Sequence, residues 1–213
     1  MERHFTAVDR VINIMDQALR LSTGLTPEPA RENPAGSTHD ADMDEDTRRH
    51  VAGLMRINHT GEICAQALYA GQAATARNEE VKAEMNHAAL DEIDHLAWCG
   101  QRLQELDSKT SILNPLWYAG SFAIGAAAGI AGDGWSLGFL KETEIQVEAH
   151  LEDHLAKLPE DDRRSHAILD QMKTDEAKHA DMAANAGAYE LPQPVKDAMS
   201  FTSRIMKAVA YRL

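Results

Sequence analysis

The sequence predicts an all-α protein: a four-helix bundle with one additional amphipathic helix at each end. Three observations favour this fold class. Aromatic residues make up only 5% of the chain, and the aromatic and β-branched clusters that are typical of strands are rare. Apolar residues recur every three or four positions over long stretches, as on the buried face of a helix. Acidic and histidine residues also repeat at intervals of about one helix and one turn.

The N-terminal part is expected to lie outside the bundle. Residues 1–22 predict an amphipathic helix, and residues 23–45, rich in Pro, Gly, Thr, Asp and Glu, predict a flexible linker. Glu2 and Asp9 interrupt any continuous apolar run, so no secretory signal is expected. The apolar side of the N-terminal helix would carry Phe5, Val8, Ile12, Met15 and Leu19.

The bundle itself is expected to span residues 46–190. Its first, second and fourth helices are predicted over about 47–76, 79–106 and 161–188, because apolar residues follow the helical period in each. Acidic and histidine residues occupy positions on these stripes where apolar residues would be expected. They are Glu62, Glu92, His95, Glu176 and His179.

The third bundle helix has an apolar lead-in. Between Leu113 and Leu140 the only charged residue is Asp133, and Gly and Ala are frequent. The run falls short of the roughly 20 strongly apolar residues of a membrane span, while small residues let helices approach closely. We expect a helix that is buried on one side and touches the membrane surface on the other. The alternative is a close-packed bundle helix without lipid contact.

Residues 191–213 predict a C-terminal amphipathic helix after Leu191-Pro192-Gln193-Pro194 ends the bundle. The tail has a net charge of +3 in an otherwise acidic chain. Basic amphipathic helices often lie on anionic lipid, so we expect this helix to pack on the membrane or on the bundle. Its charged residues are Lys196, Asp197, Arg204, Lys207 and Arg212.

Two copies of one ligand pattern lie in the predicted bundle. Glu62 is followed thirty residues later by Glu92-Ile93-Asp94-His95, and Glu144 is followed thirty-two residues later by Glu176-Ala177-Lys178-His179. Residues three apart share a helix face, so each Glu-x-x-His presents a carboxylate and an imidazole together. Four antiparallel helices would bring the six side chains to one point. They form the ligand set of a two-iron or two-manganese centre in a ferritin-like bundle.

Metal binding explains why these six residues fall on apolar stripes. A buried carboxylate without a partner is destabilising, and a pair of divalent cations removes that cost. The alternative is a bundle whose acidic residues face water, as most Glu residues do. The positions of the six on the core stripes disfavour it.

Charge and cysteine content exclude several functions. The net charge of −13 disfavours nucleic acid as a partner, because a phosphate backbone requires a basic surface. Cys64 and Cys99 are too few for a thiolate metal site or a disulfide framework, and we expect two small buried side chains in a reducing cytoplasm. No Gly-rich dinucleotide fingerprint follows a predicted strand, so a resident NAD or flavin is not expected.

The order and spacing of several segments are those of a known family. The segments are Asn58-His59-Thr60-Gly61-Glu62, Tyr69-Ala70-Gly71-Gln72, Glu92-Ile93-Asp94-His95, Glu144 leading to His150, and Asp175-Glu176-Ala177-Lys178-His179. Over about 47–212 the chain resembles the demethoxyubiquinone hydroxylase family of ubiquinone biosynthesis. The resemblance implies a ferritin-type bundle with two iron ions, lying peripherally on the cytoplasmic face of the cell membrane.

The resemblance also implies a role for each site residue. His150 matches a family histidine that is expected to support a ligand from just outside the coordination sphere. The next position departs from the family, because other members often have Tyr there and this chain has Leu151. A function that depends on that Tyr is therefore not expected here. The implied ligands are Glu62, Glu92 and His95 for one iron and Glu144, Glu176 and His179 for the other, with Glu92 and Glu176 bridging.

The reaction implied by the resemblance is hydroxylation of demethoxyubiquinol, 2-polyprenyl-3-methyl-6-methoxy-1,4-benzoquinol, with O2 as co-substrate. Inserting one oxygen atom into an electron-rich ring requires O2 to accept two electrons at one place, which two Fe(II) ions can supply. The reducing electrons would come from the quinol or from a reductant such as NADH. Expected partners are the polyprenylated benzoquinol, the membrane lipid surface and other ubiquinone-biosynthesis proteins.

Four other functions suit parts of the same sequence. A ferritin-like iron-storage or ferroxidase protein would need an oligomeric shell and has no use for an apolar helix or a basic tail. A di-manganese catalase or peroxidase would use the same ligand types. A di-iron hydroxylase acting on tRNA is disfavoured by the acidic charge, and a structural bundle without metal would leave the buried carboxylates unexplained.

Overall fold

The computed structural model describes residues 16, 19–20 and 28–213, and these residues contain six long α-helices and no strand. The all-α, ferritin-like prediction is therefore confirmed for this part of the chain. The predicted amphipathic helix at 1–22 lies almost wholly outside the described residues. The helices are α2 (Glu45–Thr75), α3 (Glu79–Glu105), α4 (Asn114–Ala131), α5 (Asp133–Leu155), α6 (Arg163–Asn185) and α7 (Gln193–Ala210).

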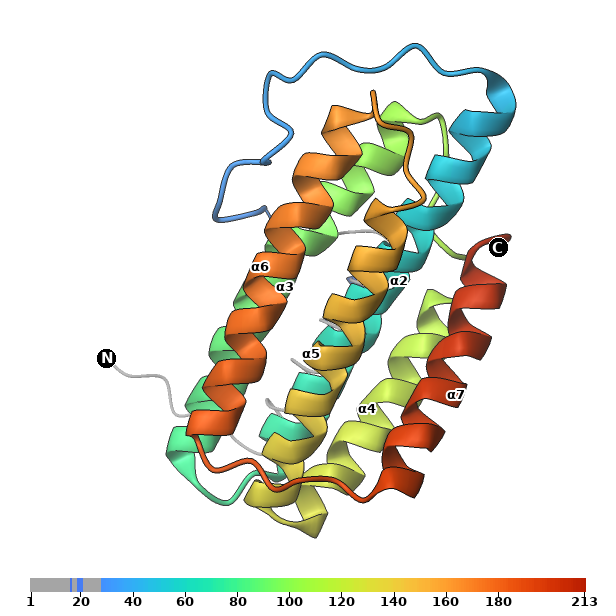
Figure 1. Ribbon diagram of the computed structural model, residues 1–213. Coiled ribbons are helices and arrows are strands. Elements are labelled where there is room, and N and C mark those ends of the chain that lie inside the picture. Colours follow the sequence, from blue (N-terminus) through green and yellow to red (C-terminus); the bar gives the residue numbers. More distant parts are fainter. Residues whose placement is uncertain (1–15, 17–18, 21–27) are drawn as a thin grey trace.

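Helices α2, α3, α5 and α6 form the bundle as two antiparallel pairs, α2 with α3 and α5 with α6 (Figure 1). Three of them begin at a side chain that accepts a backbone N–H. Asp44 accepts from Thr47 at 2.7 Å, and Asn78 accepts from Glu80 at 2.7 Å. Asp162 accepts from Ser165 N in the same way at the start of α6. Such caps satisfy N–H groups that the first turn leaves without partners.

Two apolar clusters fill the bundle, and each bundle helix contributes to both. The turn that carries the predicted metal ligands separates the two clusters along every bundle helix, so the apolar packing fixes the helices on both sides of it. The cluster near the start of α2, called the upper cluster below, includes Met55, Trp98, Leu103, Leu151 and Met172. The cluster near the end of α2, the lower cluster, includes Tyr69, Met85, Leu137, Leu140 and Ala183.

The small-residue run from residue 113 is a separate helix, not a lead-in to the third bundle helix. Helix α4 ends at Gly132, whose φ of +125° turns the chain into α5. On the bundle side, α4 lies so close to α2 that a Cβ on Gly125 would collide with the carbonyl oxygen of Leu68. On the other side Ile124 and Ile130 are exposed. The predicted close approach and one-sided burial are both present.

Residues 28–44 are not the free linker that the sequence predicts. Ala35 is fully buried in the upper apolar cluster. Arg164 of α6 donates a hydrogen bond to the carbonyl oxygen of Thr38 at 2.6 Å, and Arg102 of α3 pairs with Asp40 at 2.9 Å. The segment crosses the end of α3 and α6 (Figure 1). Its composition is that of a linker, and specific side chains hold it in place.

Helix α7 covers the other side of the bundle beside α4 (Figure 1). It packs Met206 and Ala210 against Ile57 of α2, while Phe201 and Ile205 are 60% and 46% exposed. The inner face of α7 therefore packs on the bundle, and its outer face is exposed. None of the described helices combines the length and apolar character that a bilayer span requires.

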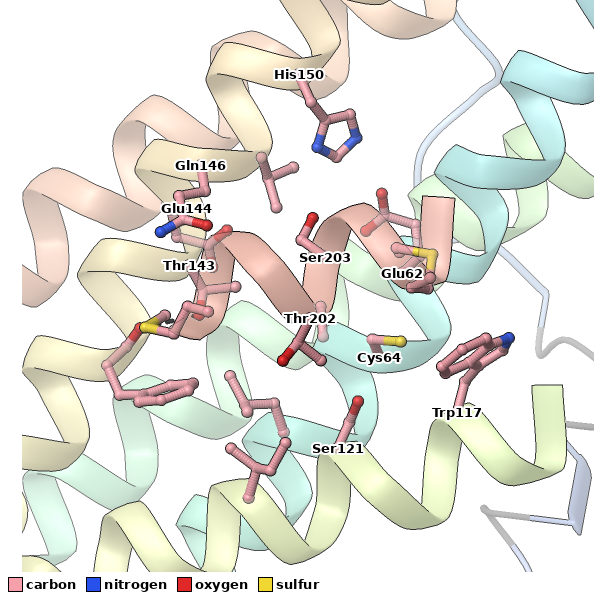
Figure 2. A pocket seen from close by; sticks show the side chains of 18 of the residues that line it. Glu62, Cys64, Trp117, Ser121, Thr143, Glu144, Gln146, His150, Thr202 and Ser203 are labelled. Atoms are coloured by element: carbon pink, nitrogen blue, oxygen red, sulfur yellow. Dashed lines mark hydrogen bonds between the residues drawn. The ribbon is translucent and has the colours of Figure 1, made fainter. Parts of the chain in front are cut away.

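A largely apolar pocket of about 310 Å³ lies between α2, α4, α5 and α7. Figure 2 shows Glu62 and Glu144 facing it from α2 and α5, with Trp117 and Ser121 on the α4 wall. The pocket depends on the tertiary arrangement of these helices and could not be predicted from local sequence patterns. The apolar side chains that line it include Leu68, Ile124, Phe139, Val147, Val195 and Met199.

Replacing Gly125 by Ala should destabilise the protein, because the added methyl group meets the backbone of Leu68. Such overpacking costs about 1–3 kcal/mol. The matched control is Gly120→Ala in the same helix, where a Cβ meets nothing within 4 Å and the better helix propensity of Ala should be neutral or stabilising. Urea unfolding measures both. Equal stability of the two variants would contradict the close α2–α4 contact.

Candidate metal centre

The structure brings together all six residues that the sequence predicts as ligands. One atom from each of Glu62, Glu92, His95 and Glu176 forms a group in which all lie within 4.8 Å of one another. Glu92, Glu144, Glu176 and His179 form a second group of the same kind. Glu92 and Glu176 belong to both groups, which is the arrangement expected of bridging carboxylates.

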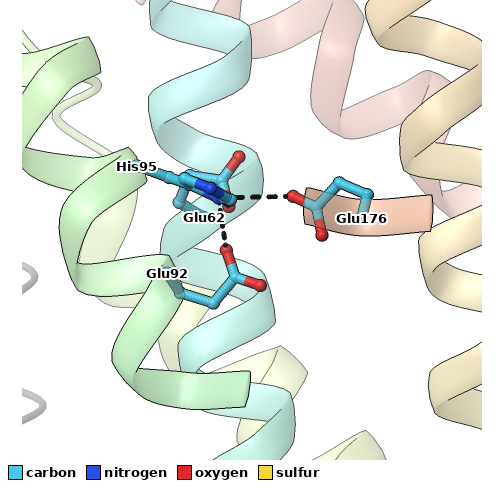
Figure 3. Close-up of side chains that lie close together, drawn as sticks. All are labelled: Glu62, Glu92, His95 and Glu176. Carbon is cyan, nitrogen blue, oxygen red and sulfur yellow. Dashed lines mark hydrogen bonds and ion pairs between the residues drawn. The ribbon is translucent and has the colours of Figure 1, made fainter. Parts of the chain in front are cut away.

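The imidazoles turn the same nitrogen atom toward the carboxylates. His95 Nδ1 lies 3.2 Å from Glu92 Oε2, 3.4 Å from Glu176 Oε1 and 3.8 Å from Glu62 Oε2. Figure 3 shows the four side chains gathered together. His179 Nδ1 lies 3.2 Å from Glu176 Oε2 and 3.6 Å from Glu92 Oε1. The two halves of the site are therefore related by an approximate two-fold symmetry that follows the sequence repeat.

The side chains fit a pair of divalent cations. The four glutamates are between 0 and 3% exposed. Within the described residues, one oxygen each of Glu92, Glu144 and Glu176 is buried without a hydrogen-bond partner. Buried polar atoms are normally satisfied, and a cation would satisfy these. Carboxylate oxygens with two imidazole nitrogens are ligands that suit iron and manganese.

Two aspartates outside the ligand groups orient the imidazoles. His95 Nε2 lies 3.3 Å from Asp175 Oδ2, and His179 Nε2 lies 3.1 Å from Asp91 Oδ2. Each contact crosses from one Glu-x-x-His motif to the other, so α3 holds the histidine of α6 and α6 holds that of α3. Carboxylates in this position fix the tautomer and orientation of a metal-binding histidine.

Sequence reasoning missed both aspartates as functional residues. The signal was present, because Asp91 precedes Glu92 and Asp175 precedes Glu176. The repeat is therefore Asp-Glu-x-x-His in both copies. Read as a longer motif, it would have marked the two aspartates as well.

The comparison with known proteins agrees with this geometry. Residues 49–210 match the family described as ubiquinone biosynthesis protein COQ7. The chain belongs to the COQ7 family. The resemblance inferred from the motifs is thereby confirmed.

Relatives of this COQ7-family chain match it along nearly its whole length. A protein of Xanthomonas oryzae pv. oryzae strain PXO99A is 56% identical over 211 residues, which cover 99% of this chain and 97% of the relative. A protein of Pseudomonas putida strain GB-1 is 52% identical over 212 residues, covering 100% and 99%. Both relatives are named 3-demethoxyubiquinol 3-hydroxylase.

His150 lies in the pocket of the COQ7-family chain, beside the ligand groups rather than in them. Burial, with a smaller effect of nearby His154, lowers its pKa to about 3, so the imidazole is neutral. Its Nε2 atom is buried and has no hydrogen-bond partner among the described residues. A supporting role for His150 at a metal ligand stays a prediction, since within the described residues His150 makes no hydrogen bond to any of the six predicted ligands.

The cysteines lie as expected of small apolar side chains. Cys99 is fully buried in the upper cluster, with Sγ 3.6 Å from Met172 Sδ. Cys64 is partly buried and lines the pocket. Burial raises the pKa of the Cys64 thiol to about 11, so it stays protonated at neutral pH.

The surroundings shift the pKa values of the carboxyl and imidazole groups at the centre in different directions. Burial and then the charges of Glu176 and Glu62 raise the pKa of Glu92. Burial would also raise the pKa of Glu176, but the hydrogen bond from His179 and the close contact with His95 outweigh it and lower that pKa to about 2. Burial opposes protonation of His179, yet its hydrogen bond to Glu176 and the charge of Glu92 raise its pKa to about 9. Histidine protons thus balance part of the carboxylate charge.

Without bound metal, the free energy of unfolding should fall as pH rises from about 6.5 to about 9. The folded-state pKa of His179 is raised, so its proton contributes full stability below the unfolded value and that contribution is lost as pH passes the folded value. His179→Gln removes this titration and should flatten the fall by up to about 1.4 kcal/mol per pH unit. Urea unfolding of chelator-treated protein measures the slope. Equal slopes would refute a protonated His179.

Proposed function

We propose that this chain is a di-iron monooxygenase, a 3-demethoxyubiquinol 3-hydroxylase that inserts one atom of O2 into the ring of demethoxyubiquinol. Membership of the COQ7 family and the shared name of relatives that match the whole chain support the substrate and reaction. The convergence of six metal-binding side chains supports the cofactor. Iron is preferred to manganese on the family relationship, because the ligand types suit both metals.

The observation that carries the proposal is where the apolar pocket ends. Three of the six proposed ligands, Glu62, Glu144 and Glu176, line it directly. A ring bound there would lie against the metal pair, and an isoprenoid tail would extend along the apolar walls of α4 and α7. Ligand pockets are mostly apolar with a few convergent polar groups. An iron store or a catalase has no need of such an apolar approach to its metals.

The side chains of the protein would bind the metal pair, orient the substrate ring and exclude water from it. The six ligands would hold the iron pair, which when bound supplies two electrons to O2. Asp91 and Asp175 fix the imidazoles from behind through their Nε2 atoms. On the pocket side, the neutral imidazole of His150 lines the wall, and its unpartnered Nε2 would accept a hydrogen bond from a hydroxyl group of the bound quinol. Apolar walls keep bulk water from the reacting ring.

We further propose that the protein lies peripherally on the cytoplasmic face of the membrane, with α4 and α7 against the lipid. Their outer side chains are large, apolar and exposed, and the pocket lies between the same two helices. A polyprenylated quinol could then enter without crossing water. The exposed side chains are Leu116, Ile124 and Ile130 on α4 and Val195, Phe201 and Ile205 on α7.

Deleting the gene for this protein should make cells accumulate demethoxyubiquinone and lose ubiquinone. A plasmid copy of the wild type should restore ubiquinone, and Glu176→Ala should not, because one carboxylate shared by both ligand groups is lost. Chromatography of lipid extracts measures both quinones. Iron analysis of the purified proteins is the companion measurement, with two irons per wild-type chain expected. Normal ubiquinone in the deletion strain would exclude the proposed reaction.

Replacing both Phe201 and Ile205 by Ser should weaken binding to vesicles of phosphatidylethanolamine and phosphatidylglycerol by about tenfold or more, since two apolar side chains no longer enter the lipid. Cosedimentation measures the bound fraction. Leu90→Ser is the control, because Leu90 is as exposed as Phe201 but lies on α3. Similar losses in the two proteins would argue against a lipid contact through α7.

A further inference from the structure

Arg31, in the segment before the bundle, contacts three aspartates behind the candidate metal centre. Its Nε donates to Asp94 Oδ2 at 2.6 Å, and its Nη1 donates to Asp175 Oδ2 at 2.7 Å. Nη2 forms an ion pair with Asp91 Oδ1 at 3.4 Å. Three nitrogen atoms of one guanidinium thus reach three carboxylates, a geometry that the fork of Arg allows and a Lys ammonium does not.

Two of these aspartates are the ones that hold the imidazoles. Asp175 on α6 faces His95 Nε2, and Asp91 on α3 faces His179 Nε2. Arg31 therefore joins the outer carboxylates of both halves of the site and lies near its approximate two-fold axis. Among the described residues, no other Lys or Arg contacts both of them.

Further contacts hold Arg31 in this position. The backbone N–H of Ala30 donates to Asp94 Oδ1 at 2.7 Å. The guanidinium lies over the ring of Trp98 at 4.9 Å, and that ring lies 5.5 Å from the ring of His95. A guanidinium that is both stacked on an aromatic ring and ion-paired is held in one orientation.

The contacts lie on the side of the centre away from the substrate pocket. Arg31 touches α3 and α6, whereas the pocket is lined by α2, α4, α5 and α7 apart from Glu176. A role in substrate binding therefore does not explain them. A role toward the histidines does.

We propose that Arg31 is a positioning residue for the metal centre, holding Asp91 and Asp175 so that both histidines direct Nδ1 toward the metals. The inference rests on the proposed function, because it requires a metal pair. Without Arg31, like charges on α3 and α6 would face each other and the two aspartates would lose their common partner. Asp175 would keep its contacts with Lys178, Gln171 and His95. Within the described residues, Asp91 would keep only its contact with His179. Both metals should be affected, since each aspartate serves a different half.

The test is anaerobic titration of Co(II) into the chelator-treated full chain, followed by visible absorption, which reports both stoichiometry and coordination. Wild type should bind two Co(II). Arg31→Ala should bind them about 10–100-fold more weakly, as is usual when a group that orients a metal ligand is lost. Arg31→Lys should fall between the two, because it keeps the charge and loses the fork.

Arg164→Ala is the matched control. Arg164 holds the same segment through the carbonyl oxygens of Gly36 and Thr38 but contacts none of the three aspartates. Near wild-type binding by this variant, with weakened binding by Arg31→Ala, supports the proposal. Equal weakening of both would assign the effect to docking of the segment and overturn it, as would unaltered binding by Arg31→Ala.

Circular dichroism checks that each variant is folded. If Arg31→Ala does not fold, Arg31→Lys decides: weaker binding supports the proposal and wild-type binding overturns it. Failure of the wild type to bind two Co(II) would overturn the proposed metal centre and this inference with it. Two Co(II) in the wild type with an unaltered Arg31→Ala would overturn the role of Arg31 alone.

Discussion

Mutual repulsion among four buried glutamates is the physical constraint on which this structure depends. Glu62, Glu92, Glu144 and Glu176 come together in the buried interior of the bundle, and such a cluster would be strongly destabilising without compensating charge. Compensation comes in layers. Imidazoles lie next to the carboxylates, and aspartates behind the imidazoles are joined in turn by a guanidinium. A metal pair would supply the compensation that the protein groups leave incomplete.

The scaffold must hold this arrangement against that repulsion. In each of the four bundle helices, the turn with the proposed ligands lies between two apolar clusters, so no helix can withdraw its carboxylate without disrupting packing at both ends of the bundle. Close-packed interiors resist such displacement. The apolar core thus does more than stabilise the fold, because it keeps the unfavourable charges in the geometry that the proposed metal pair would require.

The bundle and the six converging residues could be predicted because both follow from local periodicity. A carboxylate such as Glu92 on an apolar stripe needs an explanation, and a repeated motif supplies one. Contacts that depend on the tertiary arrangement could not be read in this way. Residues 28–44 have the composition of a linker, and only the folded bundle offers Arg31 its three aspartates. The boundary between α4 and α5 is likewise hidden in the sequence, because the break rests on one glycine, Gly132, in a run that contains several.

The surroundings of the centre differ on its two sides. Behind the histidines, α3 and α6 carry charged groups that residues 28–44 cover. In front, α4 and α7 border an apolar pocket and expose apolar side chains beyond it. Charges that tune the ligands are thereby kept apart from the surface through which an apolar substrate would arrive. A bundle open on both sides would admit water to the carboxylates and weaken every electrostatic contact at the site. Residues 28–44 and the α4–α7 pair are therefore complementary parts of one enclosure.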